Sequence, residues 1–132
     1  MKLKVGSNDI FDAPEGKYTA HLESVGEPKK RINRPCSSQV RLQFRATASS
    51  GKQYLVAQTF CADLSYGSEL YQFLDSWLDG DFERLTDDDG ELDLDLLLKR
   101  KADILVTHYH HEKYEKPFVK IDAIYPQGRI ID

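Results

Sequence analysis

Five short stretches of the chain are predicted to be β-strands, and the alternation of hydrophobic and polar residues that marks a half-buried strand is clearest in residues 40–48. There an apolar set alternates with a polar set that includes Arg41 and Arg45. Shifting this strand by one residue would bury both arginines, so its register is strongly determined. In residues 53–60 both alternating sets contain apolar side chains, which leaves open whether Tyr54 or Leu55 faces the core. The predicted strands cover residues 18–25, 40–48, 53–60, 103–109 and 117–125.

One main helix is predicted between the third and fourth strands, over residues 68–78. Ser68 followed by Glu69 suits the start of a helix, and Asp79-Gly80 suits its end. The apolar residues follow the spacing i, i+3, i+4, i+7, i+8 and form one stripe: Leu70, Phe73, Leu74, Trp77 and Leu78. This stripe predicts that the helix packs on the sheet, with Trp77 in the core rather than exposed as a stacking surface for bases.

Three strands, a helix and two strands in this order predict an all-β protein with one main helix, a five-stranded Greek-key barrel of the OB-fold type. The chain has 132 residues, enough for one hydrophobic core. We expect a loosely ordered leader over residues 1–14, in which Ile10 and Phe11 offer a contact with the barrel. The barrel domain is expected over 15–127, with an acidic insertion at 79–95 and a short tail at 128–132.

Acidic and basic residues are segregated along the chain. The sequence has 18 lysines and arginines and 22 aspartates and glutamates, for a formal net charge of −4. Outside residues 75–95 there are 17 basic residues against 12 acidic ones, so a positive surface is compatible with a negative net charge. Within that segment Arg84 is the one basic residue, and the ten acidic residues are Asp75, Asp79, Asp81, Glu83, Asp87, Asp88, Asp89, Glu91, Asp93 and Asp95.

In an OB-fold the loops after the first and fourth strands usually flank the ligand. In this chain these loops are residues 28–35 and 110–116, and both are rich in basic residues. Single-strand binders combine a positive groove, which follows the phosphates, with aromatic side chains on which bases stack. Basic residues occur in the first loop, the second strand and the last hairpin, and the aromatic residues occur in the last hairpin. The candidate nucleic-acid-binding residues are Lys29, Lys30, Arg31, Arg34, Arg41, Arg45, Tyr109, Lys113, Tyr114, Lys116 and Phe118.

Five short motifs lie along residues 15–127: Glu15-Gly16-Lys17-Tyr18, Ser-x-Leu-x-x-Phe-Leu-x-x-Trp at 68–77, Asp-Leu-Asp-Leu-Leu-Leu-Lys at 93–99, Val-x-His at 106–108 and Phe-Val-x-Ile-x-x-Ile-x-Pro at 118–126. In this combination the chain resembles a group of small phage and prophage OB-fold proteins that are similar to single-stranded-DNA-binding proteins. The resemblance implies the barrel fold and, with it, a role in replication or recombination. The chain departs from the group at residues 98–101, Leu-Lys-Arg-Lys, where such proteins often have a Leu-Leu-Gly-Lys turn.

The sequence offers little support for a metal site or for catalysis. His108, His110 and His111, even with His21, lack the compact Cys/His spacing of a structural zinc site. The run 87–91 lacks the first and last carboxylates of a calcium loop. No nucleophile elbow, phosphate loop or metalloprotease motif is present in the sequence. We therefore expect neither an enzyme nor a bound cofactor or metal.

The two cysteines, Cys36 and Cys61, do not make a disulfide framework, and we expect both to be reduced in a cytoplasmic protein of a bacterial host. No apolar run approaches the ~18 residues that a membrane span requires, so no membrane association is expected.

The favoured function is single-stranded DNA binding for a phage or mobile element. RNA as the ligand and a homo-oligomeric state stay open. The main alternative is a protein-interaction module that docks a replication or host-defence protein through its acidic arm at 75–95. A nucleic-acid binder loses affinity steeply with salt, whereas a docking module does not bind oligonucleotide.

Overall fold

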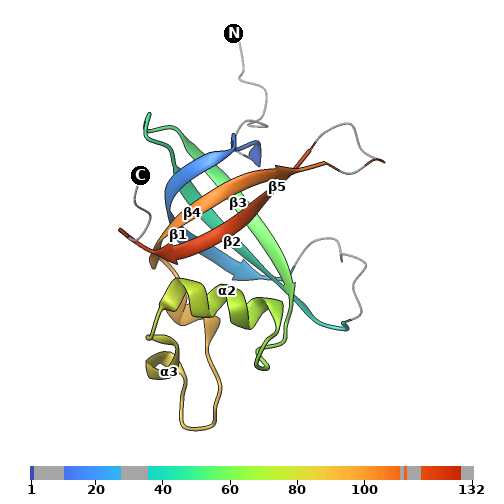
Figure 1. Ribbon diagram of the computed structural model, residues 1–132, viewed down its shortest axis with the longest axis vertical. Helices are drawn as coiled ribbons and strands as arrows, with labels where there is room; N and C mark the ends of the chain where they lie inside the picture. Colours follow the sequence, from blue (N-terminus) through green and yellow to red (C-terminus); the bar gives the residue numbers. More distant parts are fainter. Residues whose placement is uncertain (2–10, 28–35, 111, 113–116, 129–132) are drawn as a thin grey trace.

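The computed structural model describes residues 1, 11–27, 36–110, 112 and 117–128. One antiparallel sheet of five strands, in the order β3-β2-β1-β4-β5, forms most of the molecule (Figure 1). This confirms a mostly β fold with one main helix. The strands are β1 (Gly16–Gly26), β2 (Gln39–Thr47), β3 (Gln53–Cys61), β4 (Lys101–Tyr109) and β5 (Phe118–Pro126).

The sheet is strongly coiled, so its two edge strands approach each other (Figure 1). The register shifts between Leu22 and Ser24 in β1 and between Leu105 and Val106 in β4, and such irregularities increase local twist. Across the gap between the edges, the backbone N–H of Ile121 in β5 donates to Oε1 of Gln58 in β3 at 3.1 Å. The edge strands are thus linked through a side chain, while the ladder of paired strands ends at β3 and β5.

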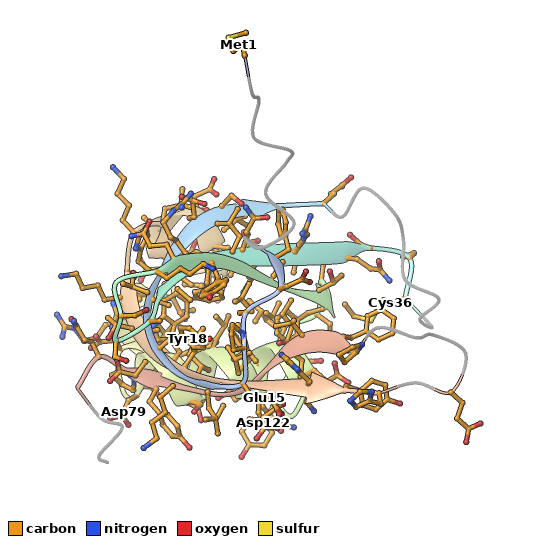
Figure 2. The ribbon with its side chains drawn as sticks, turned by 90° about the horizontal axis from the view of Figure 1, so that it is seen from above. Met1, Glu15, Tyr18, Cys36, Asp79 and Asp122 are labelled. Atoms are coloured by element: carbon orange, nitrogen blue, oxygen red, sulfur yellow. A yellow bond between two sulfur atoms is a disulfide. The ribbon has the colours of Figure 1, made fainter. Side chains whose placement is uncertain are left out.

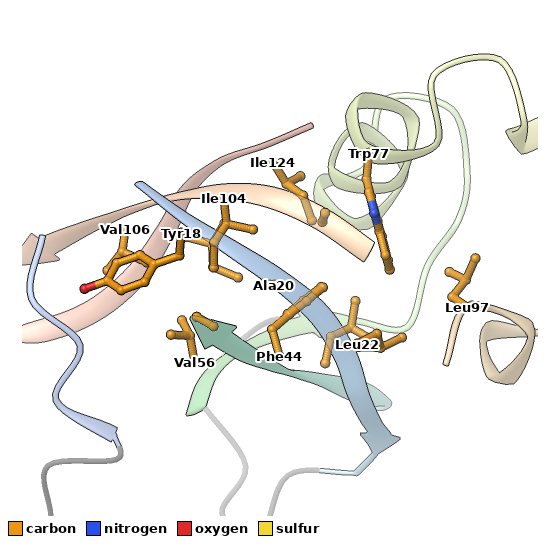
Figure 3. Close-up of a cluster of buried hydrophobic side chains, with 14 of the residues drawn as sticks. Tyr18, Ala20, Leu22, Phe44, Val56, Trp77, Leu97, Ile104, Val106 and Ile124 are labelled. Atoms are coloured by element: carbon orange, nitrogen blue, oxygen red, sulfur yellow. The ribbon is translucent and has the colours of Figure 1, made fainter. Parts of the chain in front are cut away.

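The core lies on the concave side of the coiled sheet (Figure 3). β2 has the predicted register, with Phe44 fully buried and Arg41 on the other face. The structure also settles the orientation of β3, because Tyr54 and Val56 are buried whereas Leu55 is partly exposed.

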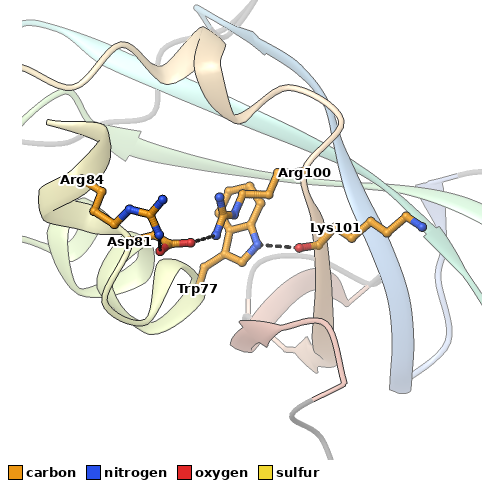
Figure 4. A network of polar contacts seen from close by, with 5 residues as sticks. All are labelled: Trp77, Asp81, Arg84, Arg100 and Lys101. Carbon is orange, nitrogen blue, oxygen red and sulfur yellow. Dashed lines mark hydrogen bonds and ion pairs between the residues drawn. The ribbon is translucent and has the colours of Figure 1, made fainter. Parts of the chain in front are cut away.

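Helix α2 (Glu69–Leu78) covers one end of this core, as the apolar stripe predicts. The Ser68 side chain caps it by accepting from the backbone N–H of Tyr71 at 3.1 Å. Trp77 is fully buried, lies edge-on to Phe44 with ring centroids 5.4 Å apart, and donates from Nε1 to the Lys101 carbonyl at 2.9 Å (Figure 4). The prediction of a core position for Trp77 is confirmed.

The acidic segment after α2 forms an arm of short elements: α3 (Phe82–Leu85), a bridge between Thr86 and Leu92, and the 3₁₀ helix η1 (Leu94–Leu97). Leu97 is fully buried in the core. At the root of the arm, Asp81 pairs with Arg100 at 2.7 Å and with Arg84 at 3.3 Å (Figure 4).

The expectation of two reduced cysteines is wrong, because Cys36 and Cys61 form a disulfide. The cause lies in the register of the sheet, in which Gln39 at the start of β2 pairs with Cys61 at the end of β3. This pairing brings Cys36 to a Cα–Cα distance of 5.9 Å from Cys61, within the usual range for a disulfide.

In the described residues, no helix is long and apolar enough to cross a membrane.

Candidate nucleic-acid interface

A groove of about 250 Å³ runs between the outer face of β2–β3 and the start of β5. β2 contributes Arg41, because alternation along the strand points this side chain away from the core. Its neighbour β3 contributes the outward-facing Leu55 and Ala57. The lining residues are Phe11, Asp12, Arg41, Leu55, Val56, Ala57, Pro117, Phe118 and Val119.

Aromatic side chains lie exposed at the β5 side of this groove. Phe118, the first residue of β5, is 48% exposed, and it stands opposite Tyr109, the last residue of β4, which is 52% exposed. Phe11, from the segment before β1, is the second exposed ring that lines the groove itself, with Phe118. Such flat apolar surfaces, partly open to solvent, are suited to stack on nucleobases.

The two predicted arginines of β2 differ in their surroundings. The Arg45 Nε donates to Oε1 of Glu23 at 2.7 Å, which neutralises much of its charge. Glu23 lies at the bulge in β1, where the register shifts between Leu22 and Ser24. Among the described residues no ion pair involves Arg41. Of these two arginines, Arg41 is thus the one better placed to pair with a phosphate, while Asp12 contributes a negative charge to the same groove.

The segment 11–15 is held in place by β4. The Nε2–H of His108 donates to the Ala13 carbonyl at 2.7 Å, and the His108 backbone N–H donates to the Glu15 carboxylate at 2.9 Å. Ala13 is fully buried, although it belongs to the predicted leader. These contacts fix the chain beside the groove, and His108 therefore has a structural role.

Tyr18 strengthens the same anchor from β1. Its hydroxyl donates to the Pro14 carbonyl at 2.6 Å, and burial beside Tyr54 raises the pKa of this hydroxyl. Glu15 and Tyr18, labelled in Figure 2, mark where the chain enters β1. The phenol thus stays protonated and able to donate at any physiological pH.

Four of the predicted site residues lie in the described part of the chain: Arg41, Arg45, Tyr109 and Phe118. The structure brings Arg41 and Phe118 to one groove, with Tyr109 beside Phe118, and leaves Arg45 bound to Glu23. The other predicted residues, Lys29, Lys30, Arg31, Arg34, Lys113, Tyr114 and Lys116, lie outside the described residues.

Sequence reasoning missed Phe11, Asp12, Leu55 and Ala57 as groove residues. An exposed strand face with two apolar residues, Leu55 and Ala57, was a usable signal for the last two. The position of Phe11 depends on the contacts of His108 with Ala13 and Glu15, which no local pattern reveals.

A larger hollow of about 300 Å³ lies at the start of β1, beside Thr47 and Asp103. It contains one cation, Lys17, and none of the predicted site residues. No group of three metal-ligating side chains occurs in the described ranges.

No protein-family model and no curated protein matches this chain.

Proposed function

We propose that the protein binds single-stranded DNA along the groove between β3 and β5, in the manner of an OB-fold. One observation carries this proposal: Arg41 and two exposed aromatic rings, Phe118 and Phe11, line the same groove. A cation and flat apolar faces in one groove are the two elements that sequence-tolerant single-strand recognition requires.

In this mechanism no covalent chemistry occurs. The guanidinium of Arg41 pairs with a backbone phosphate and releases condensed counterions. Unpaired bases stack on Phe118, with Tyr109 and Phe11 extending the surface. Each stacked base contributes on the order of 1–3 kcal/mol. Duplex DNA is disfavoured because its bases are not available for stacking.

The arrangement of elements supports the OB-fold assignment. The coiled five-stranded sheet has a helix between β3 and β4 that covers one end of the core, and its edge strands are linked by the Gln58–Ile121 hydrogen bond. In OB-folds the ligand lies on the β2–β3 face, beside the loops that follow β1 and β4. The groove with Arg41 and Phe118 lies along the outer face of β2–β3 and reaches the start of β5, which supports a ligand on that face. A role in replication or recombination of a phage or mobile element fits the motif resemblance.

The test is fluorescence anisotropy with a labelled oligothymidine of about 15 nucleotides, a length near the upper site size of one OB-fold. The parent protein is expected to bind this oligothymidine and not to bind the corresponding duplex. Phe118→Ala should weaken binding by about tenfold, since stacking of one base is lost. Arg41→Gln should weaken binding and reduce the salt slope by about 0.7.

Two matched variants control for general effects. Tyr125→Ala removes another exposed aromatic ring of β5, and Arg84→Gln removes an exposed arginine of the arm. Both should retain parental affinity. Equal losses in these controls, or a parent protein that binds no oligonucleotide, would contradict the proposal. A labelled RNA of the same length distinguishes the two nucleic acids.

A further inference from the structure

Three aromatic rings form a continuous row outside the DNA groove. Tyr66, in the segment before α2, contacts Tyr71 on α2 with ring centroids 5.3 Å apart. Tyr71 in turn contacts Phe82 at the start of α3 with centroids 5.0 Å apart. The row thus joins three separate segments of the chain: Phe82 packs against the core, and Tyr66 lies outside it.

The outer end of this row is open to solvent. Tyr66 is 91% exposed, and it gains nothing from burial in the isolated chain. Large aromatic side chains that are exposed yet ordered against one another are typical of protein-interaction surfaces, where tyrosine is enriched.

Carboxylates lie near each member of the row along the chain. Asp75 is exposed and lies one helical turn after Tyr71 on α2, so the two side chains share a face. Glu83 is exposed and directly follows Phe82. Hydrogen bonds from Ser65 lower the pKa of Asp63, near Tyr66, and keep this carboxyl ionised. These carboxylates would repel a phosphate backbone. The row is therefore expected to bind a different ligand from the groove of Arg41.

We propose that the Tyr66–Tyr71–Phe82 row is a docking surface for an arginine-bearing basic peptide segment of a partner protein. A guanidinium stacks on an exposed tyrosine through cation–π attraction and at the same time pairs with a neighbouring carboxylate. Tyr66 and Tyr71 offer the aromatic faces, and Asp75 offers the carboxylate. Charge complementarity with the acidic arm selects a basic occupant over an acidic or neutral one.

The proposal is tested with labelled peptides of alternating arginine and glycine, and with lysine–glycine and glutamate–glycine versions. The parent protein should bind the arginine peptide best, the lysine peptide less tightly and the glutamate peptide not at all. Tyr66→Ala and Asp75→Asn should each weaken arginine-peptide binding by about fivefold, the loss expected for one exposed cation–π contact or ion pair.

Matched controls separate the row from bulk charge. Asp88→Asn removes the same charge as Asp75→Asn but at the exposed turn of the arm, and Tyr125→Ala removes an exposed tyrosine on β5. Both should leave peptide affinity within about twofold of the parent. Equal weakening by Asp88→Asn, or a parent that binds no arginine peptide, would overturn the proposal.

Oligonucleotide binding provides the independent readout. Tyr66→Ala should leave it unchanged, because the row and the Arg41 groove are separate surfaces. If Tyr66→Ala instead lowers affinity for oligothymidine and leaves peptide binding intact, the row is a stacking surface for bases and the peptide proposal is wrong. Failure of DNA binding in the parent would not affect the peptide result.

Discussion

At the scale of single residues, Lys99 stands out because its backbone adopts a conformation that suits glycine. Its φ is 68°, in the left-handed region, and its N–H donates to the Leu22 carbonyl at 2.7 Å. The turn at Lys99 therefore connects η1 to β4, and its hydrogen bond to Leu22 attaches it to β1.

Lys99→Gly is expected to stabilise the protein. The left-handed conformation costs an L-residue about 1–2 kcal/mol, whereas the added freedom of glycine in the unfolded chain costs roughly 0.4–1 kcal/mol. The free energy of unfolding should therefore rise by about 0.5–1 kcal/mol, measured by urea denaturation. Lys101→Gly, in the extended backbone of β4, should instead lower it. A destabilised Lys99→Gly variant would show that the lysine side chain itself supports the turn.

At the scale of elements, the ion pair at the root of the arm ties α3 to the start of β4. The hydrogen bond from Arg100 lowers the pKa of Asp81 below its usual value of 3.8, and Arg84 adds a smaller effect. Because the unfolded chain takes up this proton at a higher pH than the folded one, the contribution of Asp81 to stability is present above pH 3.8 and is lost as the pH falls through the lowered pKa.

Asp81→Asn should lower the Tm at neutral pH, and the difference from the parent should shrink as the pH falls below 3.8. Thermal unfolding followed by circular dichroism at several pH values measures this. Arg100→Gln should show the same pH dependence, while Asp88→Asn, with the same charge change at the arm's turn, should not. A Tm difference that is constant down to pH 2 would exclude the ion pair as its source.

The local patterns of the sequence predict the elements but not the contacts between them. Alternation places Arg41 outside and Phe44 inside, and the helical stripe places Trp77 in the core, because burial itself imposes these periods. The Cys36–Cys61 disulfide depends on the pairing of β2 with β3, and the Arg45–Glu23 ion pair lies at a bulge. Both require the tertiary register, which a local pattern does not contain.

The candidate site shows the same limit. The exposed arginines of β2 and the aromatic residue at the start of β5 are predictable, since each follows from the position of its strand. That Phe118 and Arg41 share a groove with Phe11 follows only from the coiling of the sheet and from the anchoring of residues 11–15 by His108.

At the scale of the whole molecule, the acidic arm lies apart from the groove. The arm with α3 lies beyond α2, whereas the start of β5 with its groove lies at the other end of the sheet (Figure 1). At physiological ionic strength the Debye length is about 8 Å, so exposed charges of the arm are screened from a ligand in the groove. The net charge of −4 is therefore a poor guide to how this surface meets a polyanion.

Two variants with the same change in net charge test this separation. Asp12→Asn removes a carboxylate that lines the groove, and Asp88→Asn removes one at the exposed turn of the arm. At an ionic strength of about 0.15 M only Asp12→Asn should tighten binding of oligothymidine, because only this carboxylate lies within a Debye length of the ligand. At about 0.01 M, where the Debye length grows to about 30 Å, Asp88→Asn should also tighten binding, but less than Asp12→Asn, because a charge acts more weakly the farther it lies from the ligand. If both variants change the affinity for oligothymidine equally at the higher salt, net charge rather than the groove controls binding. If Asp12→Asn instead lowers this affinity, Asp12 contacts the ligand directly. The two titrations thus measure the distance over which an exposed charge affects the affinity of the groove for its ligand.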